Sequence, residues 1–193
     1  MVDLNSNNIK LNSWIEIVFF KYSKSSLGLP FAILIGCIIL TISAKIKVPL
    51  YPVPMTMQPL AVLMIGMLYG KNLATATVGL YILQGIMGLP VFAYGGGLNY
   101  IFGPTGGFII GFFVAAFCLG YLADKGWGKN ITSSLVCMTI GLLIIYSFGI
   151  IQLSFIKGFS LALLEGFFPF IIGDLYKLAL AGLLIPMIWK YTK

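Results

Sequence analysis

The sequence predicts an all-α integral membrane protein with six transmembrane helices. Sixty per cent of its 193 residues are hydrophobic and 9% are charged, whereas roughly 25% of residues are charged in an ordinary soluble domain. The mean hydropathy of +1.03 points the same way. We therefore expect lipid to cover most of the surface of this protein.

Six apolar runs divide the chain, and each is expected to form one transmembrane helix. The runs cover residues 30–46, 57–70, 72–89, 104–123, 131–154 and 166–189. The second and third are short or interrupted by glycine for a hydrocarbon layer of roughly 30 Å. One six-helix membrane domain is thus expected at 30–193. Before it, residues 1–29 suit a cytoplasmic or interfacial segment, as either a surface helix or an ordinary tail.

The basic residues indicate topology rather than nucleic-acid binding. All twelve are Lys and they do not gather on one stretch, as a phosphate-binding face would require. In a six-span arrangement, the lysines on the side of the termini are Lys10, Lys21, Lys24, Lys71, Lys125, Lys129, Lys190 and Lys193. The other side carries Lys45, Lys47 and Lys157. This excess predicts cytoplasmic termini by the positive-inside rule, with loops 47–56, 90–103 and 155–165 outside.

Two of these outer loops have an unusual composition. Residues 90–103 carry no charge and are rich in glycine and aromatic residues, which fits either a lid folded over the bundle or a re-entrant segment that packs. Residues 48–59 contain four prolines, which stiffen the chain and remove backbone donors. The amide of Gln58 could bond a ligand, or it could satisfy a carbonyl that a proline leaves free.

Asp174 and Lys177 are a charged pair inside an apolar span, where each charge costs roughly 2.5–3.5 kcal/mol to insert. Their i, i+3 spacing puts them on one helix face, and nine helical steps from Glu165 place Asp174 about 13 Å along the helix. The pair could simply neutralise itself. Alternatively, it forms a pocket floor in which Asp174 accepts from N–H donors and Lys177 donates to a carbonyl, as a cyclic urea requires. The expected apolar walls are Tyr81, Phe92, Tyr94 and Tyr100.

Small residues at i, i+4 spacing predict close helix contacts. One ladder consists of Gly103, Gly107, Gly111 and Ala115, for which we expect packing inside the bundle. The second consists of Ala32 and Gly36 on the first helix, where an outward face that contacts a partner subunit is expected.

Several sequence signatures of enzymes are missing. The chain has no His, which excludes a His-ligated metal and removes the commonest acid–base residue. It also has no GxxxxGK[ST] loop, so it is not expected to bind ATP in that way. We therefore expect no catalytic activity and no cofactor.

Four motifs occur in one order along the chain. They are PVPMTMQ at 52–58, GLPVF at 88–92, GPTGGF at 103–108, and Pro169-Phe170 followed by Gly173, Asp174 and Lys177. From about residue 30 to its end, the sequence resembles the BioY family, the biotin-binding substrate subunits (S components) of energy-coupling factor transporters. Compared with the usual form in that family, the glycine-rich loop is one residue shorter, and Ile109 stands where some relatives carry Arg.

The resemblance implies an S-component bundle with ordered outer loops that holds biotin near the outer face of a bacterial plasma membrane. Asp174 and Lys177 would match the polar residues of the family's pocket. The further candidate contacts to the ligand are Thr56, Gln58, Tyr81, Phe92, Tyr94, Gly96, Asn99 and Tyr100.

The implied partners are a transmembrane coupling subunit of the EcfT type, which Ala32 and Gly36 would contact, and two cytoplasmic ATPase subunits. A stand-alone facilitator or secondary carrier is the alternative. A structural membrane protein is a third reading, but it does not account for the Asp–Lys pair.

Overall fold

The computed structural model describes residues 13–17 and 28–190. The expected surface segment at 1–29 therefore falls largely on residues 1–12 and 18–27, outside the described part of the chain. The long helices are α2 (Gly28–Lys45), α3 (Gln58–Ile86), α5 (Gly106–Asp124), α6 (Ile131–Lys157) and α8 (Ile171–Lys190). Shorter elements are β1 (Lys47–Val48), β2 (Met55–Thr56), α4 (Leu98–Phe102), α7 (Phe159–Gly166) and the 3-10 turn η1 (Phe168–Phe170).

The predicted class, a helical membrane protein with several spans, is confirmed. Within the described residues, five helical stretches are long and apolar enough to cross a membrane when α3 is counted as one unbroken helix. The last of them, Phe159–Lys190, includes α7, η1 and α8. Their exposed faces are apolar, as a lipid environment requires: Phe155, for example, is 87% exposed.

The predicted helices at 57–70 and 72–89 are the two arms of α3, and the chain reverses direction between them. Gly70 has non-helical φ/ψ angles of 73° and 174°, a conformation that favours glycine. In one straight helix Gln58 and Tyr81 would lie about 35 Å apart, yet Gln58 Nε2 donates to Tyr81 Oη at 2.8 Å. The arms therefore run antiparallel. Neither reaches the roughly 20 residues of a full span, so the count of six stays a prediction.

The carboxylate of Asp124 at the end of α5 holds this turn. It accepts a hydrogen bond from the backbone N–H of Lys71 at 3.1 Å, at the start of the second arm, where the first N–H groups of a helix lack partners within it. A Cβ atom at Gly70 would overlap the same carboxylate. The turn therefore needs glycine for two reasons, its positive φ angle and its contact with Asp124.

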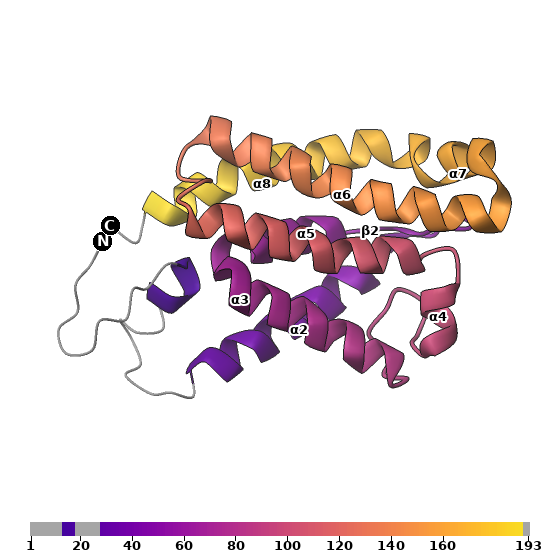
Figure 1. The fold of residues 1–193 in the computed structure, drawn as a ribbon, viewed down its shortest axis with the longest axis horizontal. Coiled ribbons are helices and arrows are strands. Elements are labelled where there is room, and N and C mark those ends of the chain that lie inside the picture. The colour runs from indigo at the N-terminus through magenta and orange to yellow at the C-terminus, as the bar shows by residue number, and fades with distance from the viewer. Residues whose placement is uncertain (1–12, 18–27, 191–193) are drawn as a thin grey trace.

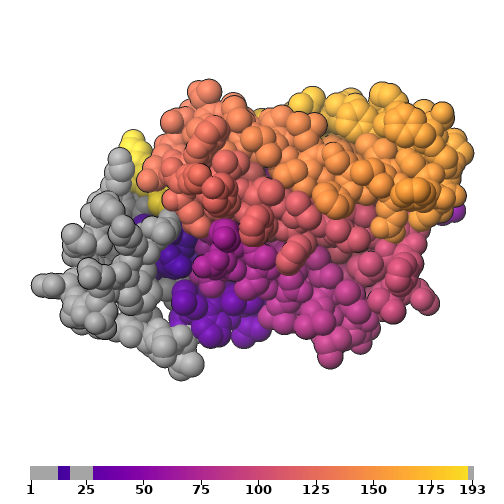
Figure 2. All heavy atoms as spheres, viewed as in Figure 1, coloured from indigo at the N-terminus to yellow at the C-terminus, as the bar shows by residue number. Residues whose placement is uncertain are grey.

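The connections that the lysine pattern assigns to the outside gather at one end of the bundle. In Figure 1, α4 and α7 lie at this end, and the chain next to β2 runs toward it. Residues 90–103, called the lid below, are tied to this end from two sides. Lys45 Nζ donates to Phe92 O at 2.6 Å, and Gln152 Nε2 of α6 donates to Ile101 O at 2.7 Å. In the space-filling view the lid segment adjoins the end of α6 (Figure 2).

Two expectations for the C-terminal third are wrong. Residues 155–165 are not an open loop, because α6 continues to Lys157 and α7 follows directly after Gly158, which has a φ of 84°. The last span does not begin at 166, since η1 separates α7 from α8. Counting helical steps from Glu165 therefore does not give the position of Asp174 along the last helix. Asp174 lies in the first turn of α8, where the helix dipole favours a carboxylate.

The glycine ladder packs α5 against α6 inside the bundle, as expected. A Cβ atom at Gly107 would overlap the carbonyl oxygen of Phe148, and one at Gly111 would lie 2.9 Å from Ile145 Cα. Gly103 lies outside this contact, because it ends α4 rather than belonging to α5.

The prediction that Ala32 and Gly36 face outward is wrong. Ala32 is fully buried, and its carbonyl accepts a hydrogen bond from Tyr69 Oη at 3.1 Å. A Cβ atom at Gly36 would overlap the side chain of Thr77. Both small residues therefore allow α2 to approach α3, and they are not available to a partner subunit.

Candidate ligand-binding site

A cavity lies between the lid, β2, the start of α3, α5, α6 and α8. Its lining residues are Val53, Pro54, Thr56, Gln58, Pro59, Ala93, Tyr100, Thr105, Phe108, Ile109, Phe112, Ile145, Tyr146, Phe170, Asp174 and Lys177. The walls are mostly apolar, with a few polar groups, which is typical of a small-molecule site.

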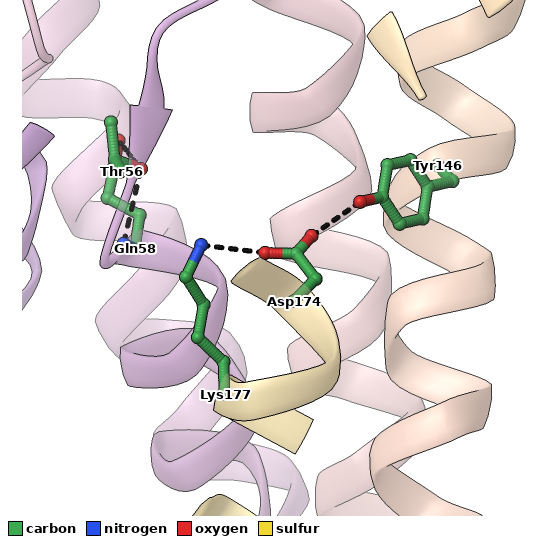
Figure 3. A network of polar contacts seen from close by, with 5 residues as sticks. All are labelled: Thr56, Gln58, Tyr146, Asp174 and Lys177. Atoms are coloured by element: carbon green, nitrogen blue, oxygen red, sulfur yellow. Dashed lines mark hydrogen bonds and ion pairs between the residues drawn. The ribbon is translucent and has the colours of Figure 1, made fainter. Parts of the chain in front are cut away.

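Three side chains form a charged pole on one side of the cavity. Asp174 and Lys177 are 4% and 6% exposed, and Lys177 Nζ lies 2.6 Å from Asp174 Oδ1. The hydroxyl of Tyr146, from the middle of α6, donates to Asp174 Oδ2 at 2.5 Å (Figure 3). Each carboxylate oxygen of Asp174 thus has one partner, and α6 and α8 are joined through these bonds.

The charged pole keeps hydrogen-bonding capacity for a ligand. A carboxylate can accept about four hydrogen bonds and an ammonium group can donate three. Asp174 accepts two of its four within the protein, and Lys177 donates one of its three to that carboxylate. The remaining capacity complements a group that has N–H donors beside a carbonyl, such as an amide or a urea. A ligand with such a group would also offset part of the desolvation cost of the buried ion pair.

A second polar group lies where β2 meets α3. Thr56 Oγ1 accepts from the backbone N–H of Gln58 at 3.2 Å, and Gln58 Nε2 donates to Tyr81 Oη at 2.8 Å. Tyr81 in turn donates to Val91 O of the lid at 3.0 Å. The Gln58 amide nitrogen thus donates to a hydroxyl rather than to a backbone carbonyl. The amide has two N–H donors, so a second remains for the cavity that Gln58 lines.

Five of the ten predicted ligand contacts line this cavity, and five do not. The lining ones are Thr56, Gln58, Tyr100, Asp174 and Lys177. The others are Tyr81, Phe92, Tyr94, Gly96 and Asn99, which the structure places in or beneath the lid.

The five non-lining residues belong to the support of the lid and to its surface. Phe92 is 1% exposed and packs between the rings of Tyr81 and Tyr100, with centroid distances of 5.6 and 4.9 Å. The side chains of Tyr94 and Asn99 are exposed. Gly96 lies so close to the carbonyl of Leu89 that a Cβ atom would overlap it. These five residues therefore support the lid and shape the site without lining the cavity.

Burial raises the pKa of Tyr100, the lid residue that lines the cavity. Its hydroxyl is therefore neutral at physiological pH and keeps a proton to donate.

Sequence reasoning missed Tyr146, which completes the charged pole. A signal for it exists: a phenol hydroxyl lies in the middle of the long apolar run of α6, between Ile145 and Ser147. A polar group at that depth needs a partner within the protein, and the charges of Asp174 and Lys177 were candidates for it. The apolar wall residues Phe108, Phe112 and Phe170 were also missed, because nothing in a uniformly apolar helix distinguishes the cavity face from the lipid face.

Membrane-spanning helices around a cavity with a charged pole define an integral membrane protein that binds a small ligand. Residues 23–193 match the model of the BioY family, and the chain belongs to that family. The resemblance noted in the sequence is thereby confirmed.

The relatives include the biotin transporter BioY of Thermotoga maritima, 40% identical over 148 residues that cover 76% of this chain and 86% of the relative. The probable biotin transporter BioY of Pyrococcus horikoshii is 38% identical over 142 residues, which cover 73% and 83%.

Among solved structures, the S-component for biotin from an ECF-type ABC transporter superimposes with a TM-score of 0.77 at 25% identity. The match covers 87% of this chain and 94% of the other. The fold is therefore that of an S component.

Proposed function

We propose that this chain is the S component of an ECF-type transporter and that it captures biotin in the cavity beneath the lid for import. The observation that carries this proposal is the charged pole of Asp174, Lys177 and Tyr146 in an otherwise apolar cavity of a BioY family member. Relatives described as biotin transporters support it.

The proposed pose follows from the chemistry of the two molecules. The ureido ring of biotin has two N–H donors and one carbonyl. The N–H groups face the carboxylate of Asp174, and the carbonyl accepts from Lys177. The sulfur-containing ring and the aliphatic tail lie against apolar walls that include Phe108, Phe112 and Phe170. Thr56, Gln58 and Tyr100 contribute further polar contacts.

The proposal includes partners that supply the energy. The chain lacks a phosphate-binding GxxxxGK[ST] loop, so ATP hydrolysis belongs to two cytoplasmic ATPase subunits, joined to this chain by a transmembrane coupling subunit. The lysine distribution supports cytoplasmic termini, with the lid at the outer face of a bacterial plasma membrane.

Titration of the detergent-solubilised protein with biotin tests ligand capture. We expect saturable one-site binding and a melting temperature that rises with biotin concentration, because a ligand that binds the native state stabilises it. Absence of both effects would refute the proposed substrate.

Uptake of labelled biotin tests the need for partners. In cells without their own biotin transporter, we expect uptake when this chain is produced with the coupling and ATPase subunits, and none when it is produced alone. Equal uptake in both cases would instead identify a stand-alone carrier.

Tyr146→Phe is expected to weaken biotin binding about tenfold, because it removes a hydrogen bond to an ionised carboxylate, worth about 1.5–3 kcal/mol. Calorimetric titration measures the change. Tyr69→Phe is the matched control, since that hydroxyl bonds Ala32 O away from the cavity and its loss should leave the affinity unchanged. Equal affinities of Tyr146→Phe and the parent would show that this hydroxyl has no part in binding.

A further inference from the structure

The charges around the cavity leave an anionic ligand without a counterion. Among the described residues that line the cavity, Lys177 is the one cation and Asp174 the one anion, and they pair at 2.6 Å. The lining as a whole is therefore neutral. Biotin, however, carries a carboxylate at the end of its tail. If the ureido ring occupies the charged pole, as the proposed function requires, the carboxylate needs a cation elsewhere.

Lys47 lies beside the cavity at the group formed by Thr56 and Gln58. In the antiparallel ladder Lys47 is the direct partner of Thr56, and directly opposed residues of such a ladder project from the same face. Thr56 is buried and lines the cavity, so the side chain of Lys47 also projects from the cavity face. In Figure 3, Thr56 and Gln58 lie on the opposite side of Lys177 from Tyr146.

The position of the Lys47 ammonium agrees with this direction. Its Nζ atom donates to the carbonyl of Ala93. Ala93 follows Phe92 in the lid and, unlike Phe92, lines the cavity. The same Nζ atom lies 3.6 Å from the ring centroid of Tyr94, an exposed lid residue outside the cavity lining, so the ammonium lies at the rim of the cavity. One donated bond leaves two N–H groups of the ammonium. Because Lys47 is partly buried, an ion pair there is screened less by salt than one in open solvent.

We propose that Lys47 binds the carboxylate of the ligand at the mouth of the cavity and thereby selects ligands with an anionic tail. This inference rests on the proposed function. It gives the site two poles: Asp174, Lys177 and Tyr146 for the ureido ring, and Lys47 for the acid. It also links ligand to lid, since the ammonium that meets the carboxylate is already bonded to Ala93 O.

Lys45 provides a matched comparison. It also donates from Nζ to a lid carbonyl, that of Phe92, at 2.6 Å. Neither lysine lines the cavity itself, but Lys45 bonds Phe92, which does not line it, whereas Lys47 bonds Ala93, which does. We therefore expect Lys45 to hold the lid without contact to the ligand. Both lysines thus donate a hydrogen bond to a carbonyl of the lid, but the proposed contact with the ligand carboxylate belongs to Lys47 alone.

The test compares biotin with biotinamide, in which a neutral primary amide replaces the acid. Dissociation constants for both ligands are measured with the parent, Lys47→Gln, Lys47→Arg and Lys45→Gln. Glutamine keeps an N–H donor for the lid carbonyl and removes the charge. We expect the parent to prefer biotin, and Lys47→Gln to reduce that preference about tenfold or more, since hydrogen bonds to charged groups are the stronger class.

Lys47→Arg should retain the preference for biotin, and Lys45→Gln should change both dissociation constants by the same factor. Lys47→Met is measured in parallel, so that a second neutral variant gives the comparison if Lys47→Gln does not fold. If the neutral Lys47 variants lose affinity for biotin and for biotinamide by the same factor, the inference is overturned and Lys47 merely supports the lid. A parent that binds both ligands equally would overturn it too, while the proposed function stands. A parent that binds neither refutes the proposed function itself.

Discussion

Asp174→Asn is expected to raise the dissociation constant for biotin by about a hundredfold or more. The amide cannot accept as strongly from the ureido N–H groups, and it leaves the Lys177 ammonium buried without a counterion. Hydrogen bonds to a charged group contribute about 1.5–3 kcal/mol each, two of them are lost or weakened, and each 1.4 kcal/mol is about a factor of ten in affinity. Calorimetric titration of the solubilised variant measures the loss.

A double variant separates binding from stability. Asp174→Asn alone should also lower the melting temperature, whereas Asp174→Asn with Lys177→Met buries no unpaired charge and should regain much of the lost stability. We expect the double variant to fold and still not to bind biotin. If it binds biotin as tightly as the parent, the pair merely fixes helix packing, which is the alternative that the sequence left open.

Gly107→Ala is expected to destabilise the bundle by about 2 kcal/mol, because the added methyl group overlaps the carbonyl of Phe148 and α5 must move away from α6. For a protein of this size that corresponds to a fall of roughly 4–8 °C in melting temperature. Biotin binding should weaken as well, since α6 carries Tyr146 of the charged pole and α5 carries apolar wall residues such as Phe108.

Gly103→Ala is the control from the same ladder. Its Cβ atom would lie 3.4 Å from Tyr100 O and 3.5 Å from Asn99 O, which is ordinary contact, so we expect a change within about 0.5 kcal/mol. Similar melting temperatures for both variants would contradict the assignment of the α5–α6 contact to Gly107.

The two charged residues of the charged pole could be found from the sequence, because a charge inside an apolar span is costly. Asp174 and Lys177 interrupt an apolar span, and such charges need a partner or a function. The composition of the lid and the prolines near Thr56 and Gln58 identified the right loops. Their order along the chain also carried the family resemblance, which the family match confirms.

The sequence did not predict which way individual side chains face. Ala32 and Gly36 show that a neighbour approaches closely, but the same spacing fits a neighbour in this chain or in another protein. In the lid, Phe92 turns inward and Tyr94 outward, because the fold of a short irregular segment depends on what it packs against. The break between α7 and α8 was missed for a similar reason. Residues 155–170 are apolar apart from Ser160 and the charged Lys157 and Glu165, which pair with each other at 2.7 Å.

An experimental structure of the protein with biotin bound would show where the ligand lies. We expect the ureido ring at the charged pole, with its N–H groups within hydrogen-bonding distance of the Asp174 carboxylate and its carbonyl facing the Lys177 ammonium. Biotin bound elsewhere, with Asp174 still contacting just Lys177 and Tyr146, would refute the proposed site.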